Sequence, residues 1–188
     1  MKRYRKTILT VVLLVLFVIT WSIVLLTVGA GTIVEAIGVE NAYLVILLVS
    51  LFGGASSFGG PAYTATLITF AAGGADPLLL AVSSGLGVSV GDTVYFFLGR
   101  YGMRVVRHEK TRERVARVRE LLDKQPAWRV PVATYVLVGF TPTPNDILTI
   151  ALGATRRPYV PIIIALVLGN VTLSYIVALF SERLTFLV

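Results

Sequence analysis

The sequence predicts an all-α integral membrane protein forming a single domain, residues 1–188, and three observations lead to this prediction. The 188 residues are 56% hydrophobic and 14% charged, whereas a soluble domain usually has about a quarter of its residues charged. Three apolar stretches are long enough to cross a bilayer as helices. Two further apolar segments are broken by glycine and proline and resemble each other. Together these features predict an inverted repeat, in which each repeat is a re-entrant helical hairpin followed by a transmembrane helix.

The first expected element is an N-terminal transmembrane helix over residues 8–29. A signal peptide has the same order of parts, but its apolar region is usually shorter than this one. We therefore expect an uncleaved signal anchor whose N-terminus lies in the cytoplasm, because basic residues flank membrane helices on that side. Four basic residues precede the helix: Lys2, Arg3, Arg5 and Lys6.

A re-entrant hairpin over residues 42–74 and a transmembrane helix over residues 77–99 are expected next. Beyond them, the tract 100–129 has ten lysines and arginines against four acidic residues. Because loops rich in lysine and arginine stay in the cytoplasm, this tract and the N-terminus should lie on the same side. Helices 8–29 and 77–99 already make two crossings, so the hairpin must enter and leave the membrane on the outer side.

The tract 100–129 has the pattern of a basic cytoplasmic amphipathic helix. Val115, Val118 and Leu122 form an apolar stripe among arginines, and such a helix is expected to lie on the anionic inner leaflet. The net charge of +7 does not favour nucleic-acid binding, because the basic residues flank apolar runs instead of covering one soluble face. Four arginines near the cytoplasmic interface are expected to contact lipid head groups: Arg104, Arg107, Arg156 and Arg157.

A second re-entrant hairpin over residues 130–153 and a transmembrane helix over residues 158–180 complete the chain. The hairpin is expected to enter from the cytoplasmic side, which keeps Arg156 and Arg157 inside and places a short C-terminus outside. The expected location is therefore the cell membrane, as a multi-pass protein with a cytoplasmic N-terminus.

The two hairpins end in similar sequences. Residues 67–73 read LITFAAG and residues 147–153 read ILTIALG. Since the hairpins are expected to enter from opposite sides, they predict the architecture in which transporters place a substrate site near the membrane midplane. The long helices that follow the hairpins carry matching pairs of a small and a polar residue: Gly91-Asp92 and Gly169-Asn170.

The stretch GFTPTPNDILTIALGA, residues 139–154, carries polar residues within a strongly apolar segment. Pro142 and Pro144 interrupt a helix, and irregular backbone at membrane depth must be buried in protein or line a wet cavity. Asn145 and Asp146 then begin the second half-helix, where they could simply cap it. Alternatively, the free N–H groups face an anionic group such as a phosphate, and Asp146 exchanges a proton.

Asp92 is expected about two turns from the cytoplasmic end of its helix. It could form an ion pair with a basic residue, or it could belong to a proton or head-group pathway. Tyr95 lies near the same face and could supply a hydroxyl, and Arg100 lies at the interface. The candidate substrate or proton pathway therefore has eight residues: Pro61, Asp92, Tyr95, Arg100, Pro142, Pro144, Asn145 and Asp146.

The sequence gives no support for an enzyme. It contains no cysteine, and it has no nucleophile elbow, zinc-protease, phosphate-binding-loop or dinucleotide-binding motif. We expect no catalytic residue, no metal site and no cofactor.

Two stretches of the chain resemble a known family. GDTVYFFLGRYG, then a basic helix, and then FTPTPNDILTIALGATRRPYVPIIIALVLGN resemble the DedA family of membrane proteins and the wider VTT, or SNARE-associated Golgi protein, superfamily. The resemblance covers roughly residues 40–180 and implies two inverted re-entrant hairpins. Bacterial members are implicated in returning polyprenyl phosphate across the membrane and in proton-motive-force homeostasis, and eukaryotic members are phospholipid scramblases.

The chain departs from the family pattern in both hairpins. Bacterial members have acidic residues in the first hairpin, where this chain has GGASSFGGPAYTAT. They have arginines around the proline of the second hairpin, where this chain has Gly139 and Asn145. The favoured function is a lipid transporter or scramblase that moves phospholipid or polyprenyl phosphate between leaflets, with proton coupling as an option. The alternatives are a small-solute or ion transporter and a non-transporting scaffold.

Membrane lipids, either anionic phospholipid or polyprenyl phosphate, are the expected partners. The small-residue helix faces also allow a homodimer, and no nucleic-acid partner is expected.

Overall fold

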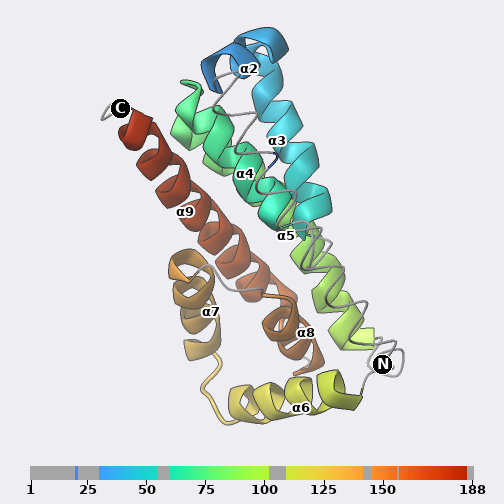
Figure 1. Ribbon diagram of the computed structural model, residues 1–188. Coiled ribbons are helices and arrows are strands. Elements are labelled where there is room, and N and C mark those ends of the chain that lie inside the picture. Colours follow the sequence, from blue (N-terminus) through green and yellow to red (C-terminus); the bar gives the residue numbers. More distant parts are fainter. Residues whose placement is uncertain are drawn as a thin grey trace.

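The computed structural model describes residues 20, 30–54, 60–101, 109–141, 145–155 and 157–185, and their regular structure is entirely α-helical. Apart from Thr20, the helix expected at 8–29 lies outside the described residues. Figure 1 shows eight labelled helices: α2 (Ala30–Ile37), α3 (Val39–Gly54), α4 (Gly60–Ala72), α5 (Pro77–Tyr101), α6 (Glu109–Asp123), α7 (Arg129–Phe140), α8 (Asp146–Ala154) and α9 (Tyr159–Thr185).

The long helices α5 and α9 pack against each other in antiparallel fashion through the centre of the molecule (Figure 1). Each contains a stretch of 25 residues that is long and apolar enough to cross a bilayer, Pro77–Tyr101 and Tyr159–Arg183. α5 begins at a proline, whose missing N–H group suits the first turn of a helix. The Asp76 carboxylate accepts a hydrogen bond from the Leu79 N–H group at 2.8 Å and so caps this end.

Two consecutive helix pairs, α3 with α4 and α7 with α8, pack on this central pair. α3 and α4 occupy the end of the molecule that carries α2, and α7 and α8 occupy the opposite end, beside α6 (Figure 1). In the first pair α3 packs on α5 and α4 packs on α9, while in the second α7 packs on α9 and α8 packs on α5. Each pair therefore places one helix against each of the two central helices.

The short helix α2 was not foreseen from the sequence. Gly38 ends it with a φ of +84°, a left-handed conformation that glycine adopts without steric cost. The chain then turns directly into α3, and the fully buried Ala42 and Ile46 of α3 pack in one apolar cluster with Val34 of α2.

Helix α8 packs so closely on α5 that there is no room for a side chain at two glycines of the contact. A Cβ atom on Gly99 would overlap the carbonyl oxygen of Ile150, and one on Gly153 would overlap the carbonyl oxygen of Phe96. Small residues at such crossings allow membrane helices to pack tightly. This contact fixes the second half of α8 against the C-terminal part of α5.

Helix α6 is shorter than the tract 100–129 that was expected to form it. It ends at Asp123, and Pro126, which cannot continue a helix, follows shortly after. Its apolar stripe does not face a leaflet, because Val115 is fully buried and packs with Ile150 and Ala151 of α8. The apolar stripe of α6 therefore packs on protein, whereas we had expected it to contact lipid. Three arginines of α6 are exposed: Arg114, Arg117 and Arg119.

The outer surface of the bundle is strongly apolar. Leu86, Val90 and Val94 repeat at intervals of four along α5 and are each about half exposed, and Phe52 of α3 is 71% exposed. Soluble proteins rarely expose continuous apolar stripes of this kind, whereas lipid accommodates them. The surface indicates that the protein associates with a membrane.

Candidate functional site

A buried polar cluster lies where α5, α8 and α9 meet. Asp92 of α5 is 3% exposed and Asn170 of α9 is 4% exposed. The Asn170 Nδ2 atom donates hydrogen bonds to the Asp92 Oδ2 atom at 2.7 Å and to the Ser89 Oγ atom at 3.1 Å. The two small-polar pairs that match in the sequence thus meet across the central helix pair.

Thr149 brings a fourth polar group to this cluster from α8. Its hydroxyl is completely buried and lies beside the Asp92 carboxylate, to which it can donate a hydrogen bond. Asp146, the first residue of α8, is close enough for its carboxylate to repel that of Asp92. We call Ser89, Asp92, Thr149 and Asn170 the Asp92 cluster.

The Asp92 cluster contains no basic group. Among the residues that the structure describes, no lysine or arginine forms an ion pair with Asp92. Asp92 therefore has no basic partner among these residues, and the Asn170 amide is the group that donates a hydrogen bond to its carboxylate. A carboxylate at this position can accept hydrogen bonds, take up a proton or contact a cation.

The other residues expected on the pathway lie around this cluster. Arg100 is one turn beyond Phe96 on α5, and its guanidinium carbon lies 5.7 Å from the Phe96 ring centre. Tyr95 is partly buried and packs in the apolar cluster that α6 completes. Pro61 lies in the first turn of α4 and is partly buried.

Asn145 precedes α8 but does not cap it through its side chain. Its backbone is helical, with φ −85° and ψ −7°, and its side chain makes no capping hydrogen bond. The simple capping interpretation of Asn145 is therefore wrong. Pro142 and Pro144, between α7 and α8, lie outside the described residues.

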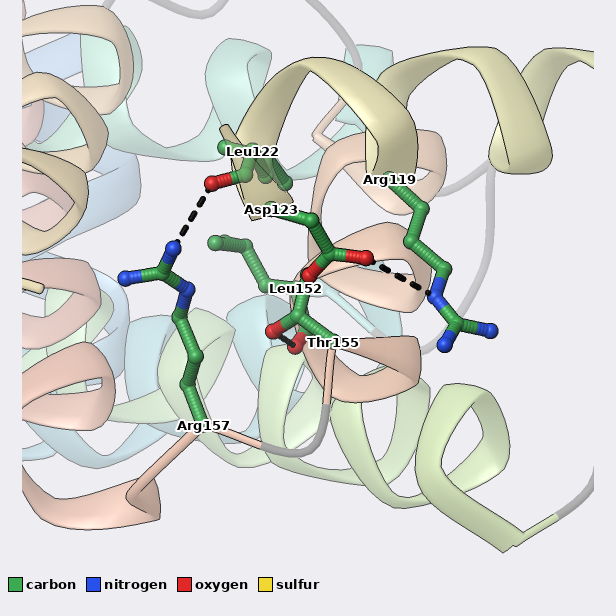
Figure 2. Close-up of polar contacts among 6 residues, drawn as sticks. All are labelled: Arg119, Leu122, Asp123, Leu152, Thr155 and Arg157. Carbon is green, nitrogen blue, oxygen red and sulfur yellow. Dashed lines mark hydrogen bonds and ion pairs between the residues drawn. The ribbon is translucent and has the colours of Figure 1, made fainter. Parts of the chain in front are cut away.

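The expected head-group residues are only partly described, because Arg104, Arg107 and Arg156 lie outside the described ranges. Arg157 donates from its Nη2 atom to the backbone carbonyl oxygens of Leu122 and Gln125, each at 2.7 Å. Figure 2 shows the first of these bonds at the end of α6. This nitrogen thus ties α6 to the segment before α9, and lipid contact by Arg157 stays a prediction.

The site selection from sequence missed three members of the cluster: Ser89, Thr149 and Asn170. Three signals could have found them. Asn170 stood in the small-polar pair that matches Asp92, and Thr149 matched Thr69 in the repeated sequence. Ser89 precedes Asp92 by three residues, which places both on one helix face.

Two further polar contacts lie along the interface of α5 and α9 or beside it. The Tyr63 hydroxyl of α4 and the Ser174 hydroxyl of α9 are 2.7 Å apart. Towards the other end, the Thr93 and Tyr159 hydroxyls are 3.2 Å apart. Along α9, Asn170 of the Asp92 cluster lies between Tyr159 and Ser174, and Asp92 is the ionisable member of the cluster.

No metal site of the usual kind is present in the described ranges, which gather no group of three or more His, Cys, Asp or Glu side chains. Comparison with known proteins gives one positive result. The family model of the VTT domain matches residues 60–183, which include helices α4 to α8 and almost all of α9. No curated protein and no solved structure matches the chain significantly.

Proposed function

This chain belongs to the VTT domain family of transporter-like membrane proteins, and we propose that it moves a phospholipid or a polyprenyl phosphate between the leaflets of a membrane. The observation that carries the proposal is the Asp92 cluster. It sets an ionisable group between the two longest apolar helices of a molecule with an apolar outer surface. An ionisable residue inside a membrane is costly and is retained mainly where it serves transport.

The packing of the hairpins supports an inverted repeat. Each hairpin contributes one helix to α5 and one to α9, and the hairpins lie at opposite ends of the central pair (Figure 1). In transporters built this way, the repeats rock against each other around a site near the midplane. In this proposal both hairpins are re-entrant, the N-terminus and α6 are cytoplasmic, and the short C-terminus is outside.

In the proposed mechanism the polar head group passes the hairpin tips while the acyl or prenyl chain stays in lipid. Asn145 and Asp146 begin α8 near the Asp92 cluster, and Asp92 or Asp146 takes part in coupling. Lipid is the proposed partner, and no catalytic step is included. Transport of a small solute or ion is the second candidate, because the near-complete burial of Asp92 suits a small species.

The test is lipid movement in proteoliposomes that contain the full chain. Fluorescent phospholipid and polyprenyl phosphate are followed separately, with and without a pH gradient. Asp92→Asn keeps the size of the side chain and its hydrogen-bonding capacity but removes the charge, so it should slow lipid movement about tenfold or more, a barrier increase of ~1.4 kcal/mol or more. Asp123→Asn is the matched control, because among the described residues this exposed carboxylate pairs only with Arg119 on α6, at 3.3 Å.

Lipid movement that is lost in Asp92→Asn and kept in Asp123→Asn would support the proposal. No movement of either lipid under any condition would refute lipid transport and leave the small-solute candidate.

A further inference from the structure

Three aromatic residues stand at helix ends on the side of the molecule that carries α6 (Figure 1). Tyr101 ends α5, Trp128 directly precedes α7 and Tyr159 begins α9. Tyr101 is 78% exposed and Trp128 is 66% exposed. Tyrosine and tryptophan are enriched where membrane helices leave the hydrocarbon, because their rings are apolar and also carry a polar group. These aromatics therefore mark the level of the lipid head groups.

Helix α6 is held at this level by contacts with the rest of the protein. Its Val115 packs with Ile150 of α8. The Arg157 Nη2 atom donates to the carbonyl oxygens of Leu122 and Gln125, each at 2.7 Å, and Figure 2 shows the first of these bonds. The helix lies across the end of the central pair instead of continuing it (Figure 1). Its exposed side chains are therefore at head-group depth.

One flank of α6 combines basic and apolar side chains. Arg114, Arg117 and Leu121 are spaced by three and four residues, so they share one side of the helix. All three are exposed, and Leu121 is 61% exposed. In water an exposed leucine gains nothing, whereas at a membrane interface it can enter the acyl region while the arginines beside it reach phosphates.

The arginines of this flank have no acidic partner in the protein. Among the described residues, neither Arg114 nor Arg117 forms an ion pair. Two other basic side chains of this region are neutralised by acids four residues away: Arg119 by Asp123 at 3.3 Å, and Lys124 by Glu120 at 2.9 Å. The positive charge that stays unneutralised among these residues therefore lies beside Leu121.

Trp128 and Arg129 form a second exposed pair of this kind just after α6. The Arg129 guanidinium carbon lies 5.3 Å from the centre of the Trp128 ring, which is a cation–π contact. Both residues are exposed, and a stacked guanidinium keeps its N–H groups for the oxygens of a phosphate. We call Arg114, Arg117, Leu121, Trp128 and Arg129 the interface residues.

We propose that the interface residues dock on anionic phospholipid of the cytoplasmic leaflet. Leu121 and Trp128 enter the acyl region, and the three arginines contact head-group phosphates. Lipids with a net negative charge are preferred over zwitterionic ones, because a choline group leaves no net charge for an arginine to neutralise. The inference rests on the proposed function only for its topology, with α6 in the cytoplasm. The lipid bound here stays in its leaflet, so no transport is needed.

Tryptophan fluorescence measures this contact. The chain has two tryptophans, so Trp21→Phe leaves Trp128 as the only reporter. A second reporter, on the flank of α6, is Leu121→Trp in a chain with Trp21→Phe and Trp128→Phe. Each full chain is reconstituted into vesicles of equimolar phosphatidylglycerol and phosphatidylcholine. Bromine on the acyl chains of one lipid or of the other quenches a tryptophan that it touches, while the charge of the vesicles stays the same.

Brominated phosphatidylglycerol should quench both reporters more than brominated phosphatidylcholine does. Expressed as the ratio of the two association constants, this preference should fall about fivefold in Arg117→Gln at the Leu121→Trp reporter and in Arg129→Gln at Trp128. One arginine near an anionic surface is worth about fivefold in binding, or ~1 kcal/mol. Arg119→Gln is the matched control and should keep the preference, because Asp123 already neutralises this arginine.

Three results would overturn the proposal: equal quenching by the two brominated lipids, no quenching by either, or a preference that survives Arg117→Gln and Arg129→Gln. Inorganic phosphate separates head groups from the free ion. If it removes the preference when sodium chloride of equal ionic strength does not, the arginines bind free phosphate and the proposal is wrong. A preference that is kept in a chain that moves no lipid would refute transport alone.

Discussion

Asn170 holds the Asp92 carboxylate in place with one amide group. The Nδ2 atom bonds to both Asp92 and Ser89, at 2.7 and 3.1 Å. Asn170→Leu removes the donor and leaves a buried carboxylate without it, which should lower the free energy of unfolding by about 1–3 kcal/mol or more. Denaturant unfolding in detergent measures the change.

Asn41→Leu is the control for this loss, because the exposed Asn41 amide bonds only to the Ile37 carbonyl, at 2.8 Å, within the described structure. It should change stability by about 0.5 kcal/mol or less. Replacing both partners, with Asp92→Leu and Asn170→Leu together, should recover much of the loss, since the buried carboxylate and its amide donor are then removed together. Equal losses in Asn170→Leu and Asn41→Leu would show that the buried amide contributes nothing special.

At the scale of the helix, the contact of α8 with α5 determines where Thr149 lies. Gly99→Ala would drive a methyl group into the Ile150 carbonyl. Alanine gains ~0.5–1 kcal/mol over glycine as a helix former, but overpacking costs ~1–3 kcal/mol, so a net destabilisation is expected. Thermal unfolding in detergent checks it.

Gly60→Ala is the matched control, because a methyl group there meets nothing within 4 Å. Gly60 begins α4, so this change should be neutral or stabilising. The close-contact interpretation of α8 and α5 would be wrong if Gly99→Ala behaved like Gly60→Ala.

Arg157 links α6 to the segment between α8 and α9 through two carbonyl bonds of 2.7 Å. Arg157→Met should loosen the end of α6 and speed tryptic cleavage at its exposed arginines by roughly five- to tenfold, given about 1 kcal/mol for a hydrogen bond and a cleavage rate that follows local opening. Asp123→Asn, which breaks the exposed pair with Arg119 (Figure 2), should leave the rate unchanged. Equal cleavage of parent and Arg157→Met would exclude this linking role.

Local sequence signals predicted the helix boundaries, whereas contacts between distant segments could not be predicted. Proline and glycine marked the boundaries at Pro77 and between α3 and α4, and apolar length marked α5 and α9, because backbone chemistry acts locally. Val115 was read correctly as apolar-facing, but its partner was misjudged. An amphipathic pattern shows that a face is buried and does not show whether lipid or α8 covers it. The bond between Asp92 and Asn170 joins residues 78 apart in sequence, and only the tertiary packing of α5 on α9 brings them together.

At the scale of the whole molecule, the α3–α4 pair and the α7–α8 pair lie at opposite ends of the α5 and α9 pair, with α2 at one end and α6 at the other (Figure 1). The apolar outer surface between these ends is the part that lipid would cover. Acidic and basic residues follow the same division, since Glu35 and Glu40 lie in and just after α2 while α6 is rich in arginine. The positive-inside rule therefore predicts that the α6 end is cytoplasmic.

The absence of cysteine from the sequence makes this topology directly measurable. Ala36 of α2 and Ala116 of α6 are both exposed and lie at opposite ends of the molecule. In intact cells, a maleimide that cannot cross membranes should label Ala36→Cys and should label Ala116→Cys only after permeabilisation. The parent chain should stay unlabelled in both conditions. Labelling of both cysteines in intact cells would place α2 and α6 on one side. The two hairpins could then not enter from opposite sides, and the inverted repeat would lose its basis.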